Sequence, residues 1–202
     1  VRSQVPTLEL LLQVQDPDDP QPLIEGAVDY EAALGASSSE RPDLAWSPDD
    51  LYMLYTGGTT GMPKGVLLSN ANISHNVDAI DRAVLLNIKD TVLGILPFFH
   101  SFGYSVTLWA VQTLGPAAVY HFNPLDAKQV GKLSEKFGVT VLLGTPTFLR
   151  GYLRRVKPEQ FSKLDVVVVG AEKMPAELFS AFEDKFGVRP VECYGATELS
   201  PL

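Results

Sequence analysis

The sequence has 202 residues, enough for one domain with a sizeable core, and its 46% hydrophobic and 20% charged residues form an ordinary globular composition. A formal net charge of −8 argues against nucleic acid as a main partner. Cys193 is the only cysteine, which excludes an intrachain disulfide and favours an intracellular, cytoplasmic setting. We see no signal peptide and no apolar run as long as a transmembrane segment, so membrane association would come from parts outside this chain.

The first 50 residues are rich in Asp, Pro and Ser and predict an acidic, solvated connecting segment. Residues 7–14 predict one short apolar element, which the Asp- and Pro-rich run at 16–20 ends. A short helix is expected over 29–34, and a surface loop over 36–50. We therefore divide the chain into a connector, 1–50, and a part that carries the chemistry, 51–202.

Strands and helices are expected to alternate from residue 51 onward. Apolar runs predict a buried strand over 51–55 and further strands over 66–68, 91–96, 117–121, 139–143, 166–169 and 191–194. Caps, prolines and terminating glycines predict helices from Ser69 or Asn70 to about Leu86, over 105–114, from Asn123-Pro124 to Phe137, from Thr145-Pro146 onward, and over 175–186. This order predicts an α/β fold with a mainly parallel sheet and helices on both faces. Ligands gather at the carboxyl ends of such strands, where four unusual segments begin.

The first of these segments is a Gly/Thr loop from Thr56 to Gly65 with a single lysine, Lys64. Backbone N–H groups, hydroxyls and one ammonium on such a loop suit the binding of a polyphosphate. The residues that supply these groups are Thr56, Gly57, Gly58, Thr59, Thr60, Gly61 and Lys64. A Walker loop is excluded because Pro63 precedes the lysine, and the G-x-G-x-x-G pattern fails at its second glycine. An ordinary flexible turn is the alternative, which the ordered string of residues disfavours.

The second segment, residues 194–198, reads Tyr-Gly-Ala-Thr-Glu. The ring of Tyr194 can stack on a purine, the hydroxyl of Thr197 can reach a phosphate oxygen, and the carboxylate of Glu198 can hold Mg²⁺. Alone the pattern is moderately specific, and a capped turn is the alternative. Together with the first loop it strongly indicates a nucleotide site.

The third segment is Gly170-Ala171-Glu172, and the fourth centres on His100. Glu172 is equally consistent with a solvated charge at a strand end. A lone His on an apolar stretch is usually a core or gate residue. In a functional role, His100 would act by positioning and electrostatics, because no second His or Cys accompanies it as a metal ligand. Aromatic residues surround it and belong either to the core or to an apolar substrate channel: Phe98, Phe99, Phe102, Tyr104 and Trp109.

The string Thr-Gly-Gly-Thr-Thr-Gly-Met-Pro-Lys-Gly at 56–65 closely resembles the signature loop of adenylate-forming enzymes, among them acyl-CoA synthetases, aryl-CoA ligases and luciferases. The resemblance extends from about Asp49 to Pro201. It implies that the loop closes over the β- and γ-phosphates of ATP and that a turn at 170–172 borders the adenine and acyl pockets. It also implies nucleotide or metal contacts for Tyr194, Gly195, Thr197 and Glu198, with His100 near the reacting carboxylate.

The resemblance further implies a two-step reaction in which a carboxylic acid, by the apolar surroundings of His100 a fatty acid, becomes an acyl-adenylate and then passes to a thiol. CoA and an acyl carrier protein both stay open as acceptors. We expect residues 51–202 to be the ATP- and acyl-binding part of a large N-terminal domain, with the lid domain beyond Leu202 and the fragment alone inactive. The alternative is a nucleotide-binding or scaffold fragment without turnover.

Overall fold

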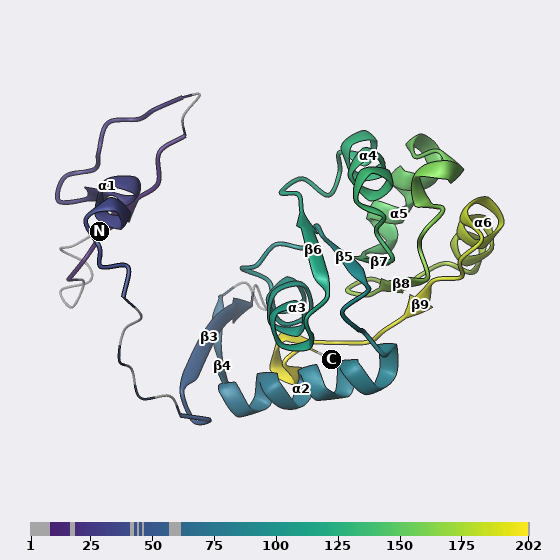
Figure 1. Ribbon diagram of the computed structural model, residues 1–202. Helices are drawn as coiled ribbons and strands as arrows, with labels where there is room; N and C mark the ends of the chain where they lie inside the picture. The colour runs from purple at the N-terminus through teal and green to yellow at the C-terminus, as the bar shows by residue number, and fades with distance from the viewer. Residues whose placement is uncertain are drawn as a thin grey trace. The chain divides into compact units, whose positions relative to one another are not determined.

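The computed structural model describes residues 9–16, 19–40, 43, 45, 47–56 and 62–201 (Figure 1). The chain divides into two compact units, residues 1–45 and 46–202. In the first unit, β1 (Leu12–Gln13) pairs in parallel with β2 (Val28–Asp29), and α1 (Tyr30–Gly35) follows. The Asp29 side chain caps α1 by accepting a hydrogen bond from the Ala32 N–H at 2.9 Å. The predicted short helix is therefore confirmed, whereas the apolar element expected over 7–14 contributes only the two residues of β1.

The second unit begins with an antiparallel hairpin of β3 (Leu51–Thr56) and β4 (Lys64–Ser69). The expectation that the first of these strands is buried was wrong, because only Leu54 of β3 is buried. A hairpin that packs through one face covers every second residue. Here the covered face joins a cluster with α2 and η1, while Leu51, Met53 and Tyr55 lie on the exposed face.

The main sheet has five parallel strands in the order β6-β5-β7-β8-β9, which confirms the predicted fold class. Its strands are β5 (Thr91–Gly94), β6 (Ala117–Tyr120), β7 (Val141–Gly144), β8 (Val166–Val169) and β9 (Val191–Glu192). Successive residues of a strand point to opposite faces, so an all-apolar strand needs cover on both. Val167 and Val169 accordingly join the cluster on one face, and Val168 joins the cluster on the other.

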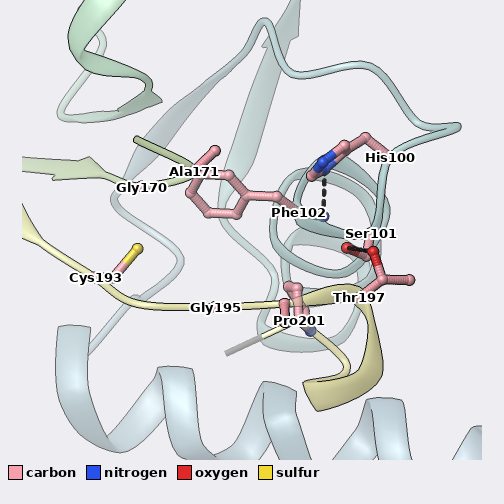
Figure 2. Close-up of a pocket in the computed structure, with 10 residues that line it drawn as sticks. His100, Ser101, Phe102, Gly170, Ala171, Cys193, Gly195, Thr197 and Pro201 are labelled. Atoms are coloured by element: carbon pink, nitrogen blue, oxygen red, sulfur yellow. Dashed lines mark hydrogen bonds between the residues drawn. The ribbon is translucent and has the colours of Figure 1, made fainter. Parts of the chain in front are cut away.

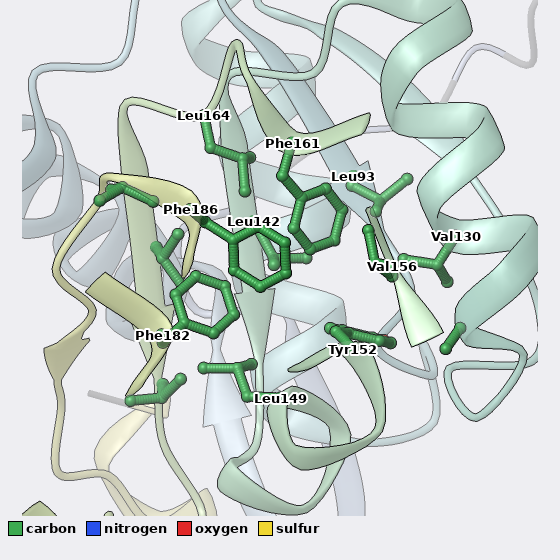
Figure 3. Close-up of a cluster of buried hydrophobic side chains, with 14 of the residues drawn as sticks. Leu93, Val130, Leu142, Leu149, Tyr152, Val156, Phe161, Leu164, Phe182 and Phe186 are labelled. Atoms are coloured by element: carbon green, nitrogen blue, oxygen red, sulfur yellow. The ribbon is translucent and has the colours of Figure 1, made fainter. Parts of the chain in front are cut away.

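Helices cover both faces of this sheet. One face carries α2 (Asn70–Val84), the π-helix η1 (Gly103–Trp109) and α3 (Ala110–Leu114). The other carries α4 (Ala127–Phe137), α5 (Pro146–Arg155), the 3₁₀ turn η2 (Pro158–Phe161) and α6 (Ala176–Phe186). Figure 3 shows the aromatic centre of this second layer, where Phe161, Phe182 and Phe186 pack beside Tyr152. The part of the chain that the structure describes has no helix of the length and apolarity that crossing a membrane requires.

One predicted helix start was wrong. Helix α4 begins at Ala127 with Asp126 as its cap, not at Asn123-Pro124. The Asn123 side chain instead accepts from the Leu125 N–H at 3.0 Å, which closes a local turn, and the Asp126 side chain caps the Gln129 N–H at 3.1 Å. The expected helix stops at Gly115, Gly138 and Gly187 are confirmed.

Candidate functional site

A cavity of about 190 Å³ lies where β8 and β9 end, facing the start of the helix that contains η1 (Figure 2). We call it the first cavity. It brings together three of the four segments that the sequence singled out. Its lining residues are His100, Ser101, Phe102, Gly170, Ala171, Cys193, Gly195, Ala196, Thr197 and Pro201.

His100 sits at the mouth of the first cavity, and its imidazole is held by the backbone. The backbone N–H of Phe102 donates to His100 Nδ1 at 3.2 Å, and the backbone N–H of His100, not its ring, donates to the Pro97 carbonyl at 3.1 Å. Because Nδ1 accepts, the neutral ring carries its proton on Nε2. His100 therefore offers one N–H donor to a group in the cavity.

Thr197 begins the 3₁₀ turn η3 (Thr197–Leu199), which neighbouring elements hold in place. The buried Ser101 donates from its hydroxyl to Thr197 Oγ1 at 3.4 Å. Asn76 on α2 donates from Nδ2 to the Leu199 carbonyl at 3.4 Å, and the Ala196 N–H donates to the Pro201 carbonyl at 2.8 Å. The Thr197 hydroxyl is thus fixed beside the same space as His100.

Gly170 and Ala171 follow β8 and form the opposite wall. A Cβ atom at residue 170 would lie 2.7 Å from Cys193 Sγ, so only glycine lets the two strand ends approach this closely. Ala171 has a φ of +66°, a left-handed conformation that costs an alanine about 1 kcal/mol or more. Backbone strain of this kind is concentrated at functional sites.

A second cavity of about 520 Å³ adjoins the first and shares Ala171, Cys193 and Gly195 with it. Tyr194 lines the second cavity and is 84% exposed, so its ring is available for stacking. Glu172 lines it too, and its carboxylate accepts a hydrogen bond from the Thr147 hydroxyl at 2.7 Å. Each of two segments, 170–172 and 194–197, therefore contributes residues to both of the adjoining cavities.

The Gly/Thr loop is only partly described. Its Gly57, Gly58, Thr59, Thr60 and Gly61 lie outside the described residues, and their assignment to phosphate binding stays a prediction. Thr56 and Lys64, at the two ends of this stretch, face each other in the hairpin register, and Lys64 is exposed.

The strand that Lys64 begins lies against the turn that carries Thr197 and Glu198 (Figure 1). Glu198 is exposed and lies outside the lining of both cavities. Within the described ranges, no three His, Cys, Asp or Glu side chains gather as metal ligands. A single carboxylate still fits Mg²⁺, which prefers one or two carboxylates plus phosphate oxygens.

The structure separates the aromatic residues around His100 into three groups. Phe102 lines the first cavity. Tyr104 stacks on Tyr52 of β3 with ring centroids 4.2 Å apart, and Trp109 packs in the same cluster. The remaining two, Phe98 and Phe99, line a separate surface cavity with Tyr120 and Phe122.

Two lining residues had no functional signal in the sequence. Ser101 is an unremarkable serine until the fold brings it to Thr197, and Cys193 is a lone cysteine in a strand-like run. Cys193 is half-buried and lines both cavities. Burial raises the pKa of its thiol, and the neighbouring Glu192 adds to this effect, so the thiol is neutral at physiological pH.

A family model described as AMP-binding enzyme matches residues 2–202. The chain belongs to this family. That membership confirms the resemblance to adenylate-forming enzymes that the loop at 56–65 suggested. The AMP-binding chain is 32% identical over 183 residues to a medium-chain-fatty-acid–CoA ligase of Ectopseudomonas oleovorans, covering 88% of this chain and 33% of the relative.

It is also 34% identical over 172 residues to a long-chain-fatty-acid–CoA ligase of Bacillus subtilis, covering 80% of this chain and 29% of the relative. Among solved structures, ATP-bound MatB of Rhodopseudomonas palustris superposes with a TM-score of 0.78 at 26% identity, covering 88% of this chain and 35% of that one. The AMP-binding chain thus spans about a third of the length of the curated relatives it matches.

Proposed function

We propose that this chain supplies the ATP- and acyl-binding part of an acid–thiol ligase that converts a carboxylic acid into an acyl-adenylate and then into a thioester of CoA. The substrate we favour is a fatty acid. The observation that carries the proposal is that His100, the 170–171 turn and Thr197 line one cavity at the strand ends, with Tyr194 in the adjoining cavity. Family membership and the names of the relatives support the reaction class.

In the first step, a carboxylate oxygen of the acid attacks the α-phosphorus of ATP. The new O–P bond forms as the bond from the α-phosphorus to pyrophosphate breaks, and pyrophosphate leaves with that electron pair. His100 Nε2–H orients the carboxylate, and the Thr197 hydroxyl donates to an α-phosphate oxygen, so both groups work by positioning and charge stabilisation.

The remaining nucleotide contacts are assigned by chemistry. The exposed ring of Tyr194 stacks on adenine in the second cavity, with Gly195 and the 170–172 turn along its edge. Lys64 and the loop from Thr56 to Gly61 hold the β- and γ-phosphates and neutralise the leaving pyrophosphate. Glu198 would hold Mg²⁺, which supplies further charge neutralisation on the phosphates when bound.

In the second step, the acceptor thiol loses its proton, its sulfur bonds to the acyl carbon, and AMP leaves with the electrons of the C–O bond. CoA is the acceptor we favour, because the curated relatives are named CoA ligases. An acyl carrier protein is the second candidate. The two are separated by supplying either thiol to enzyme that has already formed the adenylate.

The test is ATP–pyrophosphate exchange by the full-length protein, with Mg²⁺ and a panel of acetate, straight-chain fatty acids and an aromatic acid. We expect exchange that depends on the acid and is strongest with medium- or long-chain fatty acids. Acid-dependent exchange with acetate or the aromatic acid as best substrate would correct the substrate class alone. Nucleotide binding without exchange for any acid would favour the rival function, a binding or scaffold protein without turnover.

A further inference from the structure

A groove of about 630 Å³ lies between α4 and η2. These elements belong to the helix layer on the face of the main sheet opposite α2, and Figure 1 shows α4 and α5 on that side. We call this hollow the α4–η2 groove. It shares no lining residue with the first or the second cavity. Four cations and two carboxylates line it, namely Lys128, Lys132, Arg155, Lys157, Glu135 and Glu159.

Positive charge is concentrated in the part of the chain that builds this groove. Residues 127–164 hold eight of the 16 Lys and Arg residues but only two of the 24 Asp and Glu residues. The chain as a whole has a net charge of −8, so the sign of this helix layer is opposite to that of the rest. A surface that concentrates charge of one sign attracts ligands of the other sign, and the groove is therefore suited to an anion.

The cations of the groove are not neutralised by carboxylates of the protein. Within the described residues, none of the four has an ion-pair partner, although Glu135 and Glu159 lie in the same lining. Lys128 and Lys132 stand one turn apart on α4, where like charges destabilise a helix. Arg155 ends α5 and Lys157 caps η2, so both add positive charge from the other wall. An anion bound between the two walls relieves this repulsion.

A glycine lets the two walls pack closely along the groove. A Cβ atom at residue 131 of α4 would lie 2.8 Å from Gln160 Oε1 and 3.1 Å from Val156 Cγ1. The backbone N–H of Lys157 donates to Gln160 Oε1 at 3.0 Å, which fixes the amide of this half-buried side chain. Gln160 also lines the groove, so its Nε2 group adds neutral N–H donors to the four cations.

The charge and donors of the lining match a phosphate group. Four cations and two carboxylates give the groove a net charge of +2, which balances the charge of about −1.5 to −2 on a phosphate monoester at neutral pH. A carboxylate ligand would bring only one negative charge. The lysine ammoniums can reach separate phosphate oxygens, and the guanidinium of Arg155 can bind two at once. The volume of about 630 Å³ is also typical of a small-molecule site.

We propose that the α4–η2 groove is a second anion site, which binds a phosphate monoester through Lys128, Lys132, Arg155 and Lys157. The inference goes beyond the proposed function and does not depend on it, because the groove uses none of the residues assigned to the nucleotide or the acid. The phosphate belongs either to a soluble metabolite or to a lipid headgroup. Both present the same group to the four cations, so the experiment has one arm for each source.

The soluble arm uses fructose bisphosphate as the probe and unphosphorylated fructose as the uncharged control. Calorimetric titration of the full-length protein should show binding of the bisphosphate alone, and added salt should weaken it. Lys128→Gln combined with Lys132→Gln should raise the Kd at least about tenfold through the loss of two charge-assisted hydrogen bonds. The matched control combines Lys136→Gln with Lys163→Gln, which removes two exposed lysines from the same part of the chain outside the lining. It should change the Kd less than about twofold, because exposed distant charges are screened.

A second double variant tests the other wall, in case the substitutions on α4 prevent folding. Arg155→Gln combined with Lys157→Gln should weaken binding of fructose bisphosphate to a similar degree. Lys64→Ala separates the groove from the proposed nucleotide site and should bind the probe as tightly as the wild type. Loss of probe binding in Lys64→Ala, with normal binding in both groove variants, would locate the probe at the Gly/Thr loop and overturn the groove.

The lipid arm measures co-sedimentation with phosphatidylcholine vesicles, with and without phosphatidate, which presents a phosphate monoester at the membrane surface. Co-sedimentation that requires phosphatidate and is lost in both groove variants would support the site with a lipid headgroup as its ligand. Binding of fructose bisphosphate without co-sedimentation would support it with a soluble ligand. If the wild type binds neither probe, or if the groove variants bind as well as the control variant, the proposal is wrong. A failure of ATP–pyrophosphate exchange would instead count against the proposed function alone.

Discussion

Ser101 and Thr197, which are 96 positions apart in the sequence, are joined by a hydrogen bond in which the Ser101 hydroxyl donates to Thr197 Oγ1 at 3.4 Å. The bond links the residue after His100 to the turn that we propose contacts the α-phosphate. It therefore holds the acid side and the nucleotide side of the first cavity at a fixed separation.

Ser101→Ala removes this link and should lower kcat/KM for exchange about threefold to tenfold, with little change in Tm. The bond is long, so its contribution to stability is about 0.5–1 kcal/mol. Ser74→Ala, at an exposed serine of α2, is the matched control. A variant with wild-type kinetics would show that the bond does not position Thr197.

Lys64→Ala should slow exchange in the full-length protein about tenfold or more and raise the KM for pyrophosphate. The reason is the loss of a charge-assisted hydrogen bond, worth about 1.5–3 kcal/mol, to the leaving group. Lys89→Ala removes an exposed lysine from another loop and should leave both constants unchanged. Equal pyrophosphate KM values for wild type and Lys64→Ala would contradict the assignment.

Glu198→Gln keeps the shape of the side chain but removes its charge. We expect a lower exchange rate and a higher Mg²⁺ concentration for half-maximal rate, because a neutral amide is a weaker Mg²⁺ ligand than a carboxylate. Superimposable Mg²⁺ titrations for the two forms would make Glu198 a structural residue. Glu177→Gln, on the exposed start of α6, controls for the change in net charge.

The pH dependence of Cys193 labelling tests its surroundings without any substrate. Burial, with a smaller contribution from Glu192, raises the pKa of the thiol in the folded protein, so folding favours the neutral form. That stabilisation is complete below the pKa of the unfolded thiol and is lost as pH rises through the folded pKa. The alkylation rate of native protein should therefore reach half its maximum at higher pH than that of urea-unfolded protein. A native midpoint at or below the unfolded one would contradict the burial.

The sequence predicted the sheet best where its strands are covered on both faces. Val166 to Val169 are apolar without interruption because each neighbouring residue meets a different helix layer, and the predicted strand coincides with β8. The same reasoning failed for residues 51–55. An equally apolar run there lies in a two-stranded hairpin, where half of its side chains stay exposed.

Sequence reasoning could assign to the candidate site only those residues that belong to a recognisable local motif. His100 and Thr197 stood out by neighbours in sequence, and the structure brings both to the first cavity. Ser101 and Cys193 gave no signal, because their roles depend on partners far along the chain. The predicted helix start at Asn123 was wrong because an Asn-Pro pair closes a turn as readily as it caps a helix.

The ring of Tyr52 in the β3–β4 hairpin stacks on the ring of Tyr104 in η1, so the two elements are in direct contact. Tyr52 belongs to the strand that leads into the Gly/Thr loop, and the Tyr104 N–H donates to the His100 carbonyl at 2.9 Å. A displacement of β3 is thus passed to His100 through one ring contact and one backbone hydrogen bond. Under the proposed function, binding of polyphosphate at the loop and placing of the acid's carboxylate would therefore be coupled, and the affinity for each ligand would depend on whether the other is bound.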